Sequence, residues 1–327
     1  MSSGASQSDG RALGDGKAAC PAVVDATDDR RAAAARLPAR IAFLGFGLIG
    51  ASIAMALREA GYGGRLAAWT PTGTGPAEGL RRGIVDDAPA TSQAALGKAD
   101  LVILAGPPLA VLAGLGESEL EQAVASGATA TDVASTKGML IARADARSLP
   151  FVGGHPMAGR ERSGVSSAVA SLFVDRPWVL VPAAAARERD IDRVTALAAA
   201  AGGRPIRMTA EEHDQAVAAI SHLPLVAAAA LVESVALAGE GASGAGDWPV
   251  ARALAATGWS DMTRLARGDP DMGAGILATN SAAVAARLRA FRDAIDDWLR
   301  ALEGRPAPDA LRERLLAARD ALGEPPR

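Results

Sequence analysis

One stretch of this chain, RIAFLGFGLIGASIAMALREAGYGG over residues 40–64, restricts its fold more than any other. A short apolar run, typical of a buried strand, is followed by glycines and then by apolar residues at helical spacing. Residues 45–50 read Gly-Phe-Gly-Leu-Ile-Gly, the G-x-G-x-x-G pattern. In that pattern the first glycine permits a tight turn, the second lets a pyrophosphate approach the backbone, and the third lets helix and strand pack closely. A strand, a glycine turn and a helix in this order predict a dinucleotide-binding site.

The predicted cofactor contacts come from this turn and from the ends of two further strands. Phosphate groups would lie on the free N–H groups at the start of the helix. A third apolar strand ends in Gly-Pro-Pro, and ligands of such sheets bind beyond the carboxyl ends of the strands. An ordinary strand-to-helix turn is the alternative for that loop. The predicted cofactor-binding residues are Gly45, Gly47, Leu48, Ile49, Gly50, Thr70, Thr72, Gly106 and Pro107.

The residues after the second strand bear on which dinucleotide is bound. NAD sites place an acidic residue about 20 residues beyond the glycines, where it accepts the ribose hydroxyls. Here the sequence reads AAWTPTGTGP, with hydroxyl groups and no carboxylate. Because a carboxylate would repel a 2′-phosphate and hydroxyl groups would not, we favour NADP as the cofactor, with NAD as the alternative.

Strand and helix patterns alternate as far as residue 209 and then give way to helices alone. Further strands are predicted at 65–70, 99–108, 151–155, 176–183 and 204–209, and residues 128–136 are predicted to be a strand that runs into a loop. Alternation of this kind predicts an α/β fold, a doubly wound Rossmann-type parallel sheet over 40–209. Residues 210–327 are predicted to form an all-helical domain, which looks too thin to hold a core alone and is therefore expected to form a homodimer. Residues 1–39 lack apolar periodicity and are predicted to be a disordered tail.

Composition excludes several classes of function. The net charge is −3 and aromatic residues make up 3% of the chain, so there is neither a basic field nor a stacking surface for nucleic acid. A single cysteine and three scattered histidines predict no disulfide framework and no metal site. Alanine-rich runs are interrupted by glutamate, so no membrane span is predicted, and we expect a cytoplasmic protein.

Two polar side chains follow neighbouring strands of the predicted sheet. Ser135 lies in TDVASTK, just past one strand, and His155 lies in GGHPMAG, just past the next. Both would open onto the crevice that holds the dinucleotide. A neutral imidazole there can accept a proton from a substrate hydroxyl while hydride leaves the same carbon. The alternatives are a turn histidine with its hydrogen bonds satisfied and, for Ser135, an N-cap of the helix that begins near Lys137.

Three further residues stand out in the helical half. His222 lies in SHLP and Arg264 lies in GWSDMTRLA, and either alone would most often be a surface or packing residue. His213, in EEHDQ near a helix start, is interpreted as structural.

Five motifs in order, GFGLIGASIA, TDVASTKG, GGHPMAG, EEHDQAVAAISHLP and MTRLA, resemble the prephenate/arogenate dehydrogenase family. The resemblance runs from about residue 40 to about residue 300. It implies a nucleotide-binding domain followed by a helical dimerisation domain. The implied reaction is an oxidative decarboxylation in tyrosine biosynthesis. Hydride moves from ring carbon C4 to NAD(P)+, the C4 hydroxyl loses its proton, and the ring carboxylate leaves as CO2.

The resemblance also implies roles for four residues. The family's catalytic histidine corresponds to His155, and the motif serine, near the same hydroxyl, corresponds to Ser135. His222 and Arg264 are implied to bind substrate carboxylates. Prephenate and arogenate both remain open as the substrate.

Two other functions are open on the sequence. A 3-hydroxyacid or imine reductase of similar two-domain build typically relies on a lysine in the helical half, and no lysine follows Lys137 here. A non-catalytic NAD(P)-sensing protein would not need Ser135, His155, His222 and Arg264 together.

Overall fold

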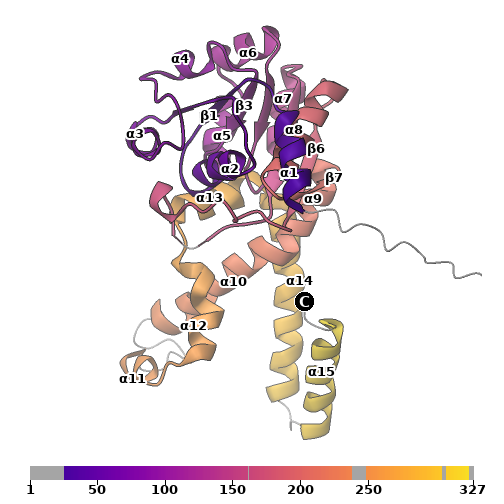
Figure 1. The fold of residues 1–327 in the computed structure, drawn as a ribbon. Coiled ribbons are helices and arrows are strands. Elements are labelled where there is room, and N and C mark those ends of the chain that lie inside the picture. Colours follow the sequence, from indigo (N-terminus) through magenta and orange to yellow (C-terminus); the bar gives the residue numbers. More distant parts are fainter. Residues whose placement is uncertain (1–25, 161, 238–247, 304–306, 324–327) are drawn as a thin grey trace, which may run out of the picture.

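The computed structural model describes residues 26–160, 162–237, 248–303 and 307–323 (Figure 1). A seven-stranded sheet in the order β2-β1-β3-β4-β5-β6-β7 is followed by helices alone. The predicted fold class, a Rossmann-type α/β domain followed by an all-helical domain, is confirmed. The strands are β1 (Arg40–Leu44), β2 (Arg65–Trp69), β3 (Leu101–Leu104), β4 (Thr129–Asp132), β5 (Phe151–Pro156), β6 (Pro177–Pro182) and β7 (Arg204–Arg207).

The sheet is parallel from β2 through β5, and its last two strands run the other way. β6 pairs antiparallel with β5, and β7 pairs parallel with β6. Among its described residues, the segment between β5 and β6 contains one 3-10 turn, Val165–Ser167, and no α-helix. A parallel pairing needs a crossover, usually a helix, so this connection returns the chain antiparallel.

Helices cover both faces of the sheet. Buried side chains of α1, α2 and α8 pack on one face, and those of α5, α6 and α7 pack on the other. The helices of this domain are α1 (Ala26–Ala35), α2 (Leu48–Glu59), α3 (Thr74–Arg81), α4 (Ser92–Leu96), α5 (Pro108–Gly114), α6 (Ser118–Ala125), α7 (Gly138–Ala146) and α8 (Glu188–Ala200).

The prediction of a disordered tail is wrong for its last part, because α1 is ordered against the sheet domain. Ala33, Ala34 and Leu37 are buried in the core on the face covered by α8. The Arg30 guanidinium donates to the carbonyls of Ala200 and Ala56, each over 3.2 Å. Small alanine side chains supply this buried face, and such a face is too weakly apolar to register as helical periodicity. Residues 1–25 lie outside the described part of the chain.

The helical half begins with a 28-residue helix, Ala210–Leu237, which contains two π-helical turns. Its first part contacts α7 and α14, and α13 contacts α5, so it docks against the sheet domain. Figure 1 shows two limbs that extend away from the sheet, one with α11 and α12 and one with α14 and α15. The helices are α9 (Ala210–Val217), α10 (Leu223–Val232), α11 (Trp248–Ala253), α12 (Thr257–Thr263), α13 (Pro270–Thr279), α14 (Ser281–Glu303) and α15 (Pro308–Ala321).

The helix Ala210–Leu237 is long and apolar enough, by length and composition alone, to cross a membrane. Its N-terminal part, however, carries His213, Asp214 and His222, which are buried against other parts of the protein. Buried polar groups of this kind are typical of a core helix that contributes to a site.

Candidate active site

A cavity of about 1070 Å³ lies beyond the carboxyl ends of β1, β2 and β3. This is the edge at which ligands of open α/β sheets bind, and the volume is ample for a dinucleotide. Six of the predicted cofactor residues line it: Gly45, Gly47, Thr70, Thr72, Gly106 and Pro107. The other three, Leu48, Ile49 and Gly50, form the first turn of α2.

Glycine suits each of the three positions of the turn for a different geometric reason. Gly45 has a φ of +100°, and a Cβ there would lie 2.5 Å from the Ala105 carbonyl oxygen. A Cβ on Gly50 would lie 3.0 Å from the carbonyl oxygen of Gly45, so helix and turn are closely packed. A Cβ on Gly47 would have nothing within 4 Å, and Gly47 is one of the residues that line the cavity. The backbone is therefore open at the position where a phosphate can reach the N–H groups of the α2 first turn.

The loop after β2 presents hydroxyl groups to the same cavity. Thr70 Oγ1 accepts a hydrogen bond from the Gly73 N–H at 3.1 Å, and the Thr72 and Thr74 hydroxyls are 3.1 Å apart. Glu78 also lines the cavity and is ion-paired with Arg81.

The glycines before His155 allow strand β5 to lie close to its neighbours. A Cβ on Gly153 would lie 2.9 Å from Cδ of Lys137, and one on Gly154 would lie 2.4 Å from the carbonyl oxygen of Asp132. The Gly154 N–H donates to the Asp132 carboxylate at 2.9 Å. Side chains at these two positions would push β5 away, so Gly-Gly is what holds His155 at its place at the end of the strand.

The loop that carries Ser135 is fixed by a buried ion pair. Lys137 Nζ and Asp132 Oδ2 are 2.6 Å apart, and both side chains are fully buried. Burial raises the pKa of Asp132 and lowers that of Lys137, and the ion pair opposes both shifts. Asp132 also accepts the Ala134 N–H at 2.8 Å. Breaking such a pair leaves an uncompensated buried charge, so the loop is strongly held in this conformation.

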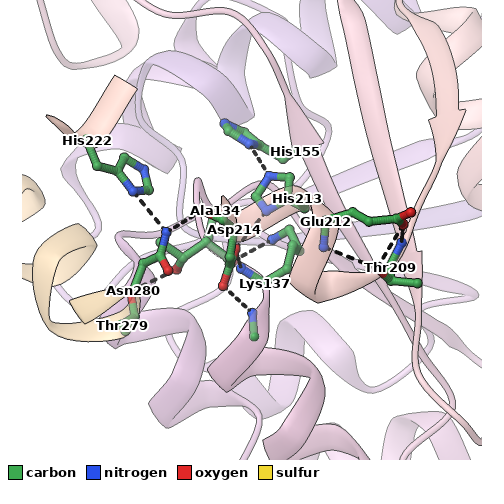
Figure 2. Close-up of polar contacts among 12 residues, drawn as sticks. Ala134, Lys137, His155, Thr209, Glu212, His213, Asp214, His222, Thr279 and Asn280 are labelled. Carbon is green, nitrogen blue, oxygen red and sulfur yellow. Dashed lines mark hydrogen bonds and ion pairs between the residues drawn. The ribbon is translucent and has the colours of Figure 1, made fainter. Parts of the chain in front are cut away.

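His155 is the first member of a row of hydrogen-bonded side chains (Figure 2). Its Nδ1 lies 2.8 Å from Nε2 of His213, and Nδ1 of His213 lies 2.8 Å from Oδ1 of Asp214. The Asp214 carboxylate also accepts the backbone N–H groups of Lys137 and Gly138, at 2.8 and 2.7 Å. Asp214 thus satisfies the first N–H groups of α7 from the other domain.

These surroundings set the protonation of the row. Burial, together with His213, Lys137 and His222, lowers the pKa of His155 well below its ordinary value of 6.5. Burial raises the pKa of Asp214, but hydrogen bonds from His213, Gly138 and Lys137 outweigh it and hold this pKa below its ordinary value. At neutral pH His155 is therefore an uncharged imidazole and Asp214 is a carboxylate.

His222 belongs to the same network through Asn280. The Asn280 side-chain amide donates to the backbone carbonyl of Asp214 at 2.8 Å and lies 3.2 Å from Nδ1 of His222. Burial lowers the pKa of His222 to about 4, against the opposing effect of Asp214. Since Nδ1 accepts from an amide N–H, the proton of this neutral ring is on Nε2. That atom is buried and has no partner within the described residues.

Ser135 and Arg264 are placed differently. The Ser135 hydroxyl is buried and makes no hydrogen bond to the parts of the chain that the structure describes. It does not cap α7, whose N-cap residue is Lys137, so the N-cap alternative for Ser135 is wrong. Arg264 begins an exposed 3-10 turn, Arg264–Arg267, which packs against α10. It thus lies on a separate element from the histidine network.

Sequence reasoning missed three members of the site. His213 was interpreted as structural, and Asp214 and Asn280 were not singled out. All three histidines of the chain are joined in one network, although they are far apart in sequence. The available signal is a His-Asp pair nine and eight residues before His222 on a largely apolar helix. Within the described ranges, no three His, Cys, Asp or Glu side chains are grouped as metal ligands.

Two family models match the chain. The model for the prephenate dehydrogenase nucleotide-binding domain matches residues 53–207, and that for the prephenate dehydrogenase dimerization domain matches residues 209–316. A prephenate dehydrogenase of Bacillus subtilis is 31% identical over 270 residues, which are 80% of this chain and 68% of that protein.

Two solved structures are similar over most of their length. An arogenate dehydrogenase from Synechocystis is 30% identical with a TM-score of 0.69, covering 86% of this chain and 99% of that one. A prephenate dehydrogenase from A. aeolicus, in complex with hydroxyphenyl propionate and NAD+, is 26% identical with a TM-score of 0.75. The match covers 87% of this chain and 98% of that one.

Proposed function

The chain belongs to the prephenate dehydrogenase family, and on that premise we propose that it oxidatively decarboxylates prephenate or arogenate, with hydride transfer to NAD(P)+, in tyrosine biosynthesis. One observation carries the proposal. His155 is uncharged at neutral pH, and its Nε2 has no hydrogen-bond partner among the described residues. An imidazole in that state is ready to accept a proton from a ligand.

His155 acts as the base and then as the acid. Nε2 accepts the proton of the C4 hydroxyl while hydride leaves C4, and the oxygen becomes a carbonyl. Loss of CO2 returns an electron pair to the ring, which becomes aromatic and carries a phenolate oxygen. The protonated His155 gives its proton back to that oxygen, so the reaction closes with no net release of a proton. A bound nicotinamide supplies the hydride acceptor.

Ser135, His222 and Arg264 orient the substrate. The Ser135 hydroxyl and the His222 Nε2–H are buried groups without partners in the described chain, and a ligand that hydrogen-bonds both removes that cost. Arg264 is permanently charged and holds a carboxylate. Its attraction must be moderate, because the ring carboxylate leaves as neutral CO2.

The cofactor is held by the residues of the glycine turn, the Thr70–Thr72 loop and the Gly106-Pro107 loop. The open backbone at Gly47 fits a pyrophosphate, as described above. NADP is the favoured form because the loop after β2 offers hydroxyls and no carboxylate to a 2′-phosphate, and NAD is the alternative.

The protein works as a homodimer in the cytoplasm. A second copy would cover apolar side chains on the limbs of the helical domain, among them Ile295, Leu299 and Leu302 of α14, which are about half exposed. These three lie on one face of the helix. The match to a dimerization domain supports this assembly.

A kinetic comparison of prephenate and arogenate, each with NADP+ and NAD+, tests the proposal and identifies the preferred pair. The expected result is reduction of the cofactor with release of CO2. His155→Asn should abolish turnover while cofactor binding survives, and near-normal activity of that variant would refute the catalytic role. Failure of all four combinations would refute the proposed function itself.

A further inference from the structure

His213 and Asp214 belong to α9 of the helical domain. Through His213 they contact Nδ1 of His155, the proposed base on the sheet domain. The two contacts are 2.8 Å each, and the exposed fractions of His213 and Asp214 are 1% and 7%. No step of the reaction described above uses either residue.

The order of donors and acceptors along this row is determined by the carboxylate. Ionised Asp214 can only accept hydrogen bonds, so Nδ1 of His213 must carry the proton that it donates. A lone pair on Nε2 of His213 can then pair with Nδ1 of His155 only if that atom carries a proton. The remaining nitrogen of His155, Nε2, is left with a lone pair.

We propose that His213 and Asp214 are positioning residues that hold His155 in its Nδ1–H tautomer and stabilise the imidazolium formed when Nε2 takes the substrate proton. This inference rests on the proposed function, since it gives His155 the role of the base. In the proton transfer an O–H bond of the substrate breaks and an Nε2–H bond forms. The positive charge of His155 is then shared through its Nδ1–H with His213 and, through the His213 Nδ1–H, with the Asp214 carboxylate.

Stabilising the charged form of His155 matters for the second half of the reaction, in which this ring acts as an acid. His155 must hold its proton until a phenolate oxygen forms, yet burial and the neighbouring His213, Lys137 and His222 disfavour a charged ring. The Asp214 carboxylate is the negative group hydrogen-bonded into this row, and two backbone N–H groups hold it in place. Without it, the proton transfer would create an unpaired charge in a buried site.

The tautomers can be read directly, because the chain has three histidines and all belong to this network. Long-range ¹H–¹⁵N spectra of full-length protein labelled with ¹⁵N-histidine, recorded at neutral pH, show which nitrogen of each ring carries a proton. We expect Nδ1–H for His155 and His213 and Nε2–H for His222, assigned with His-to-Gln variants. An Nε2–H signal for His155 in the wild-type protein overturns the inference.

Asp214→Asn removes the carboxylate from the row. Each oxygen of Asp214 accepts a backbone N–H, so the amide NH2 of the variant also leaves Lys137 or Gly138 without its acceptor. We expect kcat to fall by about a hundredfold or more with KM little changed, as for other carboxylates that orient a catalytic imidazole. Wild-type kcat in this variant overturns the inference.

A second pair of variants keeps the test decisive if Asp214→Asn folds poorly. His213→Leu leaves His155 Nδ1 without an acceptor, whereas the carboxamide oxygen of His213→Gln can still accept the Nδ1–H. His213→Gln should therefore retain at least about tenfold more kcat than His213→Leu. Equal kcat values in the two variants overturn the inference. Gln215→Ala, on the exposed side of the same helix, is the matched control and should be unaffected.

The two proposals fail in different ways. If wild-type protein turns over neither substrate, the proposed function fails, and the ¹⁵N spectra still test the tautomers. If the protein is active and His155 carries its proton on Nε2, the inference alone is wrong.

Discussion

Alanine at Gly47 and alanine at Gly45 should have opposite consequences, although the two glycines belong to one turn. A Cβ at Gly47 meets no protein atom within 4 Å, and the backbone there has a negative φ of −101°. We therefore expect Gly47→Ala to change the free energy of unfolding by less than about 1 kcal/mol, the difference between glycine and alanine at a helix N-cap. The added methyl group, however, lies at the cavity wall where a phosphate would approach.

Gly47→Ala should mainly weaken the binding of the cofactor. A hydrogen bond from a backbone N–H to a charged group contributes about 1.5–3 kcal/mol. Displacing the pyrophosphate from one such N–H should therefore raise the Kd of the cofactor by about ten- to a hundredfold. Isothermal titration calorimetry with NADP+ and NAD+ measures this change directly.

Gly45→Ala is the contrasting variant. It places an L side chain at a φ of +100°, with Cβ 2.5 Å from the Ala105 carbonyl oxygen. The left-handed backbone alone costs about 1–2 kcal/mol, and the backbone clash adds to it. Urea unfolding without cofactor should show a loss of more than about 2 kcal/mol. If Gly47→Ala binds the cofactor as the wild type does, or Gly45→Ala is as stable as the wild type, the assignment of the turn is wrong.

Four further predictions follow from the described contacts. Since the pKa of His155 is lowered, kcat/KM should fall only as the pH drops below 6.5, and a limb at or above 6.5 would contradict a neutral, buried base. The pKa of His222 is about 4 in the folded protein and 6.5 in the unfolded chain. As the pH falls, the unfolded chain therefore binds this proton before the folded protein does. Folding stability should therefore be lost as pH falls from 6.5 to 4, by about 3 kcal/mol in all at 1.36 kcal/mol per pH unit, and His222→Gln should flatten this part of the pH–stability curve. Arg30→Ala, which removes two hydrogen bonds, should lower the free energy of unfolding by about 1–2 kcal/mol in urea titrations. Leu299→Glu should weaken the dimer in sedimentation experiments, and an unchanged dimer would place the interface elsewhere.

The sheet domain was predictable because its signals are local. A strand, a glycine turn and a helix follow one another within 25 residues at 40–64, so the pattern is complete within that segment. Ser135 lies past β4, as its local order predicts, whereas His155, predicted just past the next strand, lies within β5 as its second-last residue. The reversed direction of β6 and β7 was not predictable, because strand patterns carry no direction.

The histidine network was not predictable, because it depends on contacts between distant parts of the chain. His155 and His213 are 58 residues apart, and so are His222 and Asn280. Each of these residues taken alone has an ordinary structural explanation. Helix α1 escaped prediction for a related reason, since its small buried side chains become a recognisable face only when α8 is present to cover them.

The proposed base therefore depends on both domains. His155 is held by the sheet domain, through Gly153 and Gly154, but the residues that decide its tautomer come from α9. The same carboxylate that orients His213 also satisfies the first N–H groups of α7. Asp214 consequently serves three purposes. It links the helical half to the sheet domain, it accepts the first N–H groups of α7, and it orients the ring that pairs with His155. A chain in which the halves have not docked lacks an acceptor for His155 Nδ1, and the ring is then free to adopt the tautomer that cannot take a proton at Nε2. Placing the orienting carboxylate on the helical domain thus makes the base competent only in the fully assembled protein.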